Sequence, residues 1–252
     1  MRVAFIGGGE ITRALLNKPS IFKSIIVSGN CSKKLDYFKA KGFETTTCNK
    51  EAVKKSDVLI FATKPKDLPK VFESINNIDL KDQLPISVVA GVGSDVFFDN
   101  LKITKLIRVM PNTPASIGKG MSVWWNKSGS EHDKKICSQF LHNIGKEIEV
   151  SEENIIDKAT ALSGSGPAYV FYFIESLIDA GVHIGLSRQL SQELVIQTII
   201  GSTFLISQSK LHPSILKNNI TSPSGTTTRG LYALEKNRFK YAILEAVKNA
   251  HN

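Results

Sequence analysis

The segment VAFIGGGEITRALL, from Val3 to Leu16, constrains the fold of this chain more than any other. An apolar strand pattern runs into consecutive glycines and continues as a helix pattern. A strand that enters Gly7-x-Gly9 and leaves as a helix is the first half of a dinucleotide-binding fingerprint, in which a pyrophosphate approaches the glycines and the free N–H groups of the helix start. A purely structural glycine turn is the alternative, and the strand–helix units that follow favour the dinucleotide site.

Thr12 stands where this fingerprint has a third small residue for close packing of the helix on the strand. A β-branched side chain there predicts that the helix lies slightly further from the strand, or that the turn differs a little. Phosphate binding depends on the first two glycines, so Thr12 weakens the motif without abolishing it.

Apolar runs alternate with helix patterns through the first part of the chain. The expected strands are 3–7, 24–28, 44–47, 57–63, 86–91 and 106–112. Strands that are apolar throughout and separated by helices predict a parallel sheet covered on both faces, the doubly wound α/β class. The segments 121–126 and 146–150 are expected to extend this sheet around one more helix.

The pattern becomes helical near residue 153, which predicts a Rossmann domain at 1–153 and an all-helical domain at 154–252. The expected helices are 154–162, 167–181 with Gly181 as its C-cap, 188–209, 228–235 and 239–249. The helix AYVFYFIESLIDA is apolar on nearly every side, which indicates burial either in a core or in a subunit interface.

Composition limits the classes of partner. The net charge is +9, but the lysines are scattered and no block of five like charges occurs, so nucleic-acid binding is not expected. No membrane span is expected, since the longest apolar stretch, YVFYFIESLIDAG, is interrupted by Glu175 and Asp179 and stays short of roughly 20 apolar residues. Cys31, Cys48 and Cys137 lie far apart without metal-ligand spacing, which favours reduced thiols in a cytoplasmic protein and no bound metal.

The segment VSGNCSKK, after the second expected strand, indicates which dinucleotide binds. An NAD site carries Asp or Glu about 20 residues after the glycines, where it holds the ribose 2′-hydroxyl. Here the chain offers short donors and cations instead, namely Ser28, Asn30, Ser32, Lys33 and Lys34. These groups suit a 2′-phosphate that a carboxylate would repel, so NADPH is the expected cofactor and NADH the second choice.

The segment TSPSGTT, residues 221–227, predicts an anion site. A Ser-Pro-Ser-Gly turn feeds a helix that begins near Thr227. The free N–H groups of a helix start bind anions such as carboxylates. The hydroxyl of Thr227 either serves a ligand or caps the helix, and both roles stay open.

Six segments together carry a resemblance to a known family: IGGGEI, DVLIFATKP, VAGV, RVMPNTP, LSGSGPAYVF and ITSPSGTTTRGL. In order and spacing, over nearly the whole chain, they resemble pyrroline-5-carboxylate reductases. The resemblance implies NADPH-dependent reduction of 1-pyrroline-5-carboxylate, a small substrate with a carboxylate, to L-proline by hydride transfer to the C=N carbon. It also implies a homodimer or decamer assembled through the helical domain.

The resemblance assigns roles residue by residue. The implied cofactor-binding residues are Gly7, Gly9, Glu10, Ile11, Thr12, Ser28, Asn30, Asn49, Ala62, Lys64, Pro65, Ala90 and Gly91. The implied substrate-binding residues are Ser222, Gly225, Thr226 and Thr227, with Thr227 as the proposed catalytic group.

Two residues depart from the family pattern. Ser224 stands where the family has glycine, and a positive φ there would cost of order 1 kcal/mol relative to glycine. Arg229 replaces a smaller or neutral residue. Its guanidinium reaches a carboxylate or phosphate in one reading and points into solvent in the other, which is the commoner case for a surface arginine.

Two other functions compete with the reductase. A β-hydroxyacid dehydrogenase shares the general plan but has a lysine in the first long helix of its second domain, and AYVFYFIESLIDA contains none. A non-enzymatic NADP-sensing or scaffolding protein is the second competitor, and the TSPSGTT loop argues against it.

Overall fold

The computed structural model describes residues 1–17, 22 and 24–251, which form two compact units, Met1–Ser165 and Gly166–Asn252. The first helix after residue 153, α7 (Asn154–Ala159), contacts strands β6 and β7 of the first unit. The contacts between residues therefore separate the two units after Ser165, later than the predicted domain boundary at residue 153. The domain boundary at 153 stays a prediction.

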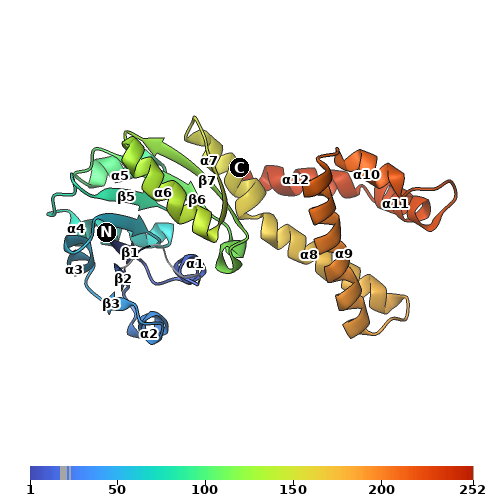
Figure 1. Ribbon diagram of the computed structural model, residues 1–252, viewed down its shortest axis with the longest axis horizontal. Coiled ribbons are helices and arrows are strands. Elements are labelled where there is room, and N and C mark those ends of the chain that lie inside the picture. The colour runs from blue at the N-terminus through green and yellow to red at the C-terminus, as the bar shows by residue number, and fades with distance from the viewer. Residues whose placement is uncertain (18–21, 23, 252) are drawn as a thin grey trace. The chain divides into compact units, whose positions relative to one another are not determined.

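The first unit is built on one eight-stranded sheet in the order β3-β2-β1-β4-β5-β6-β7-β8 (Figure 1). Its strands are β1 (Arg2–Ile6), β2 (Ser24–Ser28), β3 (Glu44–Thr46), β4 (Val58–Phe61), β5 (Leu84–Ser87), β6 (Leu106–Met110), β7 (Gly120–Lys127) and β8 (Gly145–Glu149). Strands β1 to β6 pair in parallel, which confirms the doubly wound arrangement expected from their apolar runs.

Two apolar clusters lie on opposite faces of this sheet. In β1, Val3 and Phe5 join one cluster while Ala4 and Ile6 join the other, because successive strand side chains point to opposite faces. Helices α1 (Glu10–Leu15), α2 (Ser32–Ala40) and α6 (Glu131–Ile144) contribute to the first cluster. Helices α3 (Asn49–Lys54), α4 (Leu68–Ile75) and α5 (Ser94–Asn100) contribute to the second.

Strand β7 departs from the expected parallel sheet, since it pairs antiparallel with β6. Only the short segment η2 (Thr113–Ile117) connects the two strands, and a parallel pair needs a crossover of a dozen or more residues. Strand β8 follows β7 through α6 and is parallel to it. Helix α5 was not expected from the sequence.

The second unit consists of helices alone: α8 (Gly166–His183), α9 (Arg188–Ser209), α10 (Pro213–Asn219), α11 (Thr226–Lys236) and α12 (Phe239–His251). Helix α10 was not expected. Gly181 is not the C-cap of α8, because the helix continues to His183 and Gly185 takes the left-handed position with φ +98°. Gly181 instead allows α9 to approach, since a Cβ there would lie 2.5 Å from Ser191 Oγ.

The long helices of the second unit leave much apolar surface uncovered in the single chain. Phe171 and Tyr172 on α8 are 62% and 73% exposed, and Phe204 on α9 is 63% exposed. Among the described residues, α9 is the one helix whose length and hydropathy would let it cross a membrane. Exposed apolar side chains gathered on long helices mark a surface for protein interaction.

Candidate functional site

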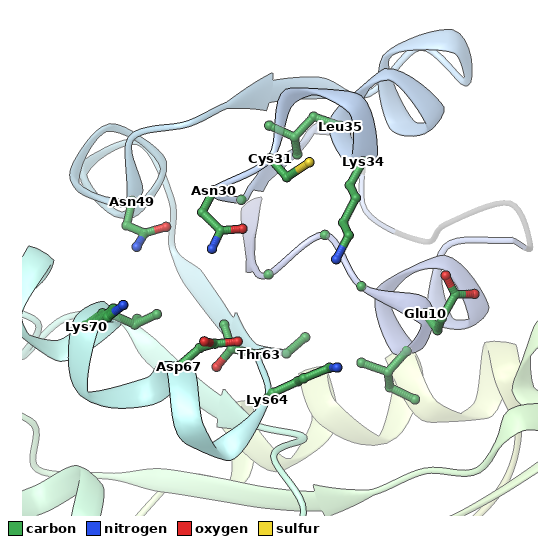
Figure 2. Close-up of a pocket in the computed structure, with 17 residues that line it drawn as sticks. Glu10, Asn30, Cys31, Lys34, Leu35, Asn49, Thr63, Lys64, Asp67 and Lys70 are labelled. Atoms are coloured by element: carbon green, nitrogen blue, oxygen red, sulfur yellow. The ribbon is translucent and has the colours of Figure 1, made fainter.

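A cavity of about 400 Å³ opens at the carboxyl ends of β1, β2 and β4. These three strands end in register, since Ile6 is paired with Ser28 on one side and with Phe61 on the other. Strand β1 is the point where the strand order reverses, and open α/β sheets bind ligands outside such a point. Figure 2 shows the lining: Gly7, Gly8, Gly9, Glu10, Ile11, Gly29, Asn30, Cys31, Lys34, Leu35, Asn49, Ala62, Thr63, Lys64, Asp67, Lys70 and Val71.

The first and second glycines of the fingerprint, Gly7 and Gly9, have different structural roles. Gly7 has φ +119°, and a Cβ there would lie 2.5 Å from the carbonyl oxygen of Ala62. The turn from β1 therefore closes against β4 only with glycine at this position. Gly9 is the N-cap of α1 at φ −93°, and a Cβ there would meet nothing within 4 Å. Gly9 lines the cavity, and the empty space beside its Cα lets a ligand approach the backbone closely.

Thr12 fits beneath the turn and does not line the cavity. Its side chain is fully buried, and its hydroxyl donates a hydrogen bond to the carbonyl oxygen of Gly7. The β-branched residue thus replaces the missing third glycine with a bond that ties α1 to the turn. Its side chain does not line the cavity, and a contact of Thr12 with the cofactor stays a prediction.

Ser28 also lies below the cavity. Its side chain has no exposed surface, and its hydroxyl donates to Asn49 Oδ1 at 2.8 Å. Asn49 Nδ2 donates in turn to Ser74 Oγ at 3.0 Å. This burial follows from the place of Ser28 at the end of an interior strand, and the implied position of Ser28 near the adenosine phosphate stays a prediction. Ser28 orients Asn49, and Asn49 faces the cavity.

The remaining predicted cofactor residues divide into two groups. Gly7, Gly9, Glu10, Ile11, Asn30, Asn49, Ala62 and Lys64 line the cavity together, whereas Pro65, Ala90 and Gly91 do not. Pro65 opens the short helix η1 (Pro65–Asp67), and the other two follow β5, one strand further along the sheet.

Cys31 and Lys70 line the cavity without having been predicted, and Lys34 was predicted only together with its neighbour Lys33. Lys34 and Cys31 come from the start of α2, and Lys70 from α4. Lys34 carried a signal, since it belongs to the cation pair after β2, but the sequence alone did not separate it from Lys33. Figure 2 shows Lys34 extending from α2 toward the glycine turn. Lys70 carried no signal, because nothing in a single helix pattern tells which residue faces a neighbouring turn.

The charged side chains of the cavity and one hydroxyl without a hydrogen-bond partner suit an anionic dinucleotide. Lys34, Lys64 and Lys70 bring three cations, against the carboxylates of Asp67 and Glu10, of which Glu10 pairs with Arg13 at 3.0 Å. Thr63 Oγ1 is buried and has no hydrogen-bond partner among the described residues. A buried hydroxyl without a partner costs free energy, so it marks a place where a ligand is expected to supply one.

The segments RVMPNTP and LSGSGPAYVF meet in the first unit. Asn112 Nδ2 donates to the carbonyl oxygen of Ser163 at 3.0 Å, and Asn112 Oδ1 accepts from the Met121 N–H at 2.9 Å. The Ser163 carbonyl belongs to a π-helical turn, η3 (Thr160–Gly164), where the expected helix 154–162 changes its hydrogen bonding. Turns of this kind are frequent at functional sites. Asn112 therefore holds the turn that leads into α8.

An ion-pair network around a buried arginine supports the same region. Arg108 is 3% exposed and its guanidinium contacts Glu153 at 2.6 Å and Asp157 at 3.2 Å. Glu153 also accepts bonds from the N–H and hydroxyl of Ser94, both at 2.6 Å. Burial raises the pKa of Glu153, but the bonds from Ser94 and Arg108 outweigh it and hold that pKa below its ordinary value.

In the second unit, the predicted substrate loop forms a tight turn before α11. The Gly225 N–H donates to the Ser222 carbonyl oxygen at 3.1 Å, and the Thr228 hydroxyl donates to the same oxygen. Helix α11 begins at Thr226 with Gly225 as its N-cap, so Thr227 does not cap the helix. The half-buried side chain of Thr227 lies in the first helical turn, where the backbone N–H groups lack helical partners.

The structure settles both departures in this loop. Ser224 has φ +56°, the left-handed conformation in which serine is strained relative to glycine. Arg229 Nη1 donates to the Ser224 carbonyl oxygen at 2.7 Å. Arg229 therefore does not simply point into solvent, because its guanidinium bonds its own loop.

Among the described residues, no group of three or more His, Cys, Asp or Glu side chains is placed to hold a metal ion. Cys31, Cys48 and Cys137 are all free thiols.

Comparison with known proteins gives matches over the full chain. A family model for pyrroline-5-carboxylate reductase dimerisation matches residues 153–252, and one for coenzyme F420-dependent NADP oxidoreductases matches residues 2–91. A pyrroline-5-carboxylate reductase of Arabidopsis thaliana is 35% identical, over 98% of this chain and 91% of that protein. One of Synechocystis is 37% identical, over 100% and 96%. The crystal structure of Plasmodium falciparum pyrroline carboxylate reductase with NADP bound superposes with a TM-score of 0.91 at 36% identity, over 100% of this chain and 95% of that one.

Proposed function

This chain belongs to the pyrroline-5-carboxylate reductase family, and from that premise we propose that it reduces 1-pyrroline-5-carboxylate to L-proline with NADPH. The observation that carries the proposal is the likeness over the whole chain to reductases of this name, one of them solved with NADP bound. The enzyme is an oxidoreductase that acts on a C=N bond.

NADPH is assigned to the cavity between β1, β2 and β4. We assign the pyrophosphate to the turn at Gly7 and Gly9, where the backbone is open, and the 2′-phosphate to the end of β2. Asn30 and Lys34 line the cavity there, and so does Asn49, whose side chain Ser28 orients. NADH, which lacks the 2′-phosphate, gains less from Lys34 and is the second choice.

The substrate carboxylate is assigned to the start of α11. The free N–H groups of its first turn and the hydroxyls of Ser222 and Thr226 offer donors to an anion, and Gly225 closes the turn beneath them. When bound, the reduced nicotinamide would supply the hydride to the C=N carbon of the substrate. The nitrogen of the pyrroline ring takes up one proton, which leaves the C–N single bond of proline. Thr227 is assigned to the reacting imine: its hydroxyl hydrogen-bonds the nitrogen and passes on that proton, directly or from water.

A second copy of the chain is assigned to the uncovered apolar faces of α8 and α9. The matched dimerisation region includes both helices, so homo-oligomerisation follows from the family, and the precise faces are part of the proposal. An interface of this kind also accounts for the hydropathy of α9 without a membrane. The free thiols suit a reducing compartment, and we assign the enzyme to the cytoplasm.

A spectrophotometric assay tests the function. Purified protein is mixed with 1-pyrroline-5-carboxylate and either NADPH or NADH, and loss of absorbance by the reduced cofactor is followed. Proline-forming turnover with a higher kcat/KM for NADPH is the expected result. Binding of NADPH without turnover would contradict the proposed reductase activity and indicate a dinucleotide-binding protein that is not an enzyme.

A further inference from the structure

The turn before α11 carries backbone strain at one residue. Ser222 accepts the bond that closes the turn, Pro223 occupies its second position and Ser224 its third, with φ +56°. A turn with proline second and a positive φ third favours glycine there, since a side chain in this conformation costs of order 1 kcal/mol. The next residue, Gly225, packs closely on the turn, since a Cβ there would lie 2.4 Å from Ser222 Oγ.

The strained residue is held by a cation from the helix that the turn introduces. Arg229 lies one turn into α11, where its own N–H donates to the Gly225 carbonyl oxygen at 3.2 Å. Its Nη1 reaches back to the Ser224 carbonyl oxygen at 2.7 Å. Hydrogen bonds from a charged donor are about twice as strong as neutral ones, so this bond offsets strain of the size that Ser224 carries.

The peptide that Arg229 holds is the one directly before the helix start. The peptide unit is planar, so fixing the Ser224 carbonyl also fixes the direction of the Gly225 N–H. That N–H closes the turn on Ser222, and the turn sets where the first N–H groups of α11 point.

We propose that Arg229 is a positioning residue that clamps Ser224 in its left-handed conformation and thereby sets the geometry of the carboxylate site at the start of α11. The inference rests on the proposed function, in which this helix start binds the substrate carboxylate. The two departures from the family pattern are then one device: serine introduces the strain and arginine compensates it.

A double-mutant cycle tests the clamp. Arg229→Met removes the donor while keeping the length of the side chain, and Ser224→Gly removes the strain. The two single variants, the double variant and the parent are compared by KM for 1-pyrroline-5-carboxylate, KM for NADPH, kcat and melting temperature.

In the parent background, Arg229→Met is expected to raise KM for 1-pyrroline-5-carboxylate about 5- to 20-fold, as the loss of a charge-assisted bond implies, with kcat and KM for NADPH changed less than about twofold. In the Ser224→Gly background the same substitution is expected to raise that KM less than about twofold, because glycine keeps the turn unaided. Melting temperatures are expected to show the same non-additivity.

Three results would overturn the clamp. An equal rise in KM in both backgrounds would mean that Arg229 attracts the substrate directly. A lowered melting temperature with unchanged KM would leave only a structural bond. If the changes in melting temperature of the two single variants simply add in the double variant, Arg229 and Ser224 are not coupled. This measurement needs no turnover, so failure of the clamp can be told apart from failure of the proposed function.

Discussion

The hydroxyl of Thr12 donates a hydrogen bond to the carbonyl oxygen of Gly7, and this bond closes the dinucleotide turn where the usual fingerprint relies on a third small residue. Thr12 is fully buried, so its hydroxyl depends on this bond for a partner. A buried hydroxyl with a partner is well tolerated, whereas the same partner left without its donor costs free energy. Thr12 is therefore part of the turn's construction and not a defect in the motif.

Thr12→Val tests this role, because valine keeps the shape and removes the hydroxyl. We expect the free energy of unfolding to fall by about 1–3 kcal/mol, since the bonded oxygen loses a buried donor. NADPH affinity is expected to fall as well. Thr12→Ser is the matched control: it keeps the bond, loses one methyl group for about 1 kcal/mol, and is expected to bind NADPH as the parent does. Equal affinities for all three proteins, measured by calorimetry, would contradict the role of the bond in the turn.

Alanine substitutions at Gly7 and Gly9 are expected to fail in different ways. At Gly7 the new Cβ collides with the Ala62 carbonyl and the φ of +119° is unfavourable, so Gly7→Ala is expected to lower the melting temperature strongly. At Gly9 the Cβ meets no protein atom, so Gly9→Ala is expected to keep the melting temperature and to weaken NADPH binding at least about tenfold, by blocking approach of the pyrophosphate. Unchanged NADPH binding by Gly9→Ala would place the pyrophosphate elsewhere.

Lys34 is expected to select NADPH over NADH. The probes are 2′,5′-ADP, which carries the 2′-phosphate, and 5′-AMP, which lacks it. Lys34→Gln is expected to weaken 2′,5′-ADP about 5- to 20-fold and to leave 5′-AMP nearly unchanged, since only the first ligand loses a charge-assisted bond. Lys33→Gln is the control, because Lys33 is the adjacent exposed lysine on α2 and does not line the cavity. An equal loss of affinity for 2′,5′-ADP in both variants would mean that general surface charge, and not a contact from Lys34, accounts for the effect.

A charge on α9 is expected to break the assembly. Phe204 is 63% exposed in the single chain, and Phe204→Glu would place a carboxylate in the proposed apolar interface. We expect light scattering to show a stable dimer or larger assembly for the parent and dissociation for the variant at micromolar concentration. Val96→Glu, at an exposed apolar residue of the first unit, is expected to keep the parent's mass. A folded monomer of the parent would rule out the assigned interface.

Much of the fold follows from local sequence pattern. Continuous apolar runs such as Val58–Phe61 locate the interior strands, because both faces of a parallel sheet are covered. The direction of β7 was not predictable from its own residues, since its antiparallel pairing is set by the short connection after β6. Gly181 was misassigned as a cap because its role, contact with Ser191, depends on a segment ten residues later.

The site shows the same limit. The glycine turn and Asn49 were predictable, the first from its motif and the second from a resemblance. The burial of Ser28 was not predictable, because a sequence pattern gives the position of a residue along a strand but not whether the last side chain of the strand points into the cavity or into the core. The bond from Arg229 to Ser224 was invisible for a similar reason: both residues stood out singly, and only the turn of α11 brings them together.

Thr227 provides the sharpest test of the chemistry. If its hydroxyl bonds the reacting imine mainly in the transition state, Thr227→Ala is expected to lower kcat about 10- to 1,000-fold, which corresponds to roughly 1.4–4 kcal/mol. KM for 1-pyrroline-5-carboxylate is expected to move less, because the backbone N–H groups that hold the carboxylate remain. Thr227→Ser restores the hydroxyl and is expected to recover most of kcat.

The neighbouring Thr228 supplies the matched control. Its hydroxyl bonds the Ser222 carbonyl within the turn, so Thr228→Ala is expected to lower the free energy of unfolding by about 1 kcal/mol and to keep kcat per folded molecule near that of the parent. Thr227 does not cap α11, because Gly225 is the N-cap, and Thr227→Ala is therefore expected to change the melting temperature less than Thr228→Ala does. Should kcat stay near the parent value in Thr227→Ala, the hydroxyl has no part in the reaction, and the start of α11 serves as a carboxylate anchor alone.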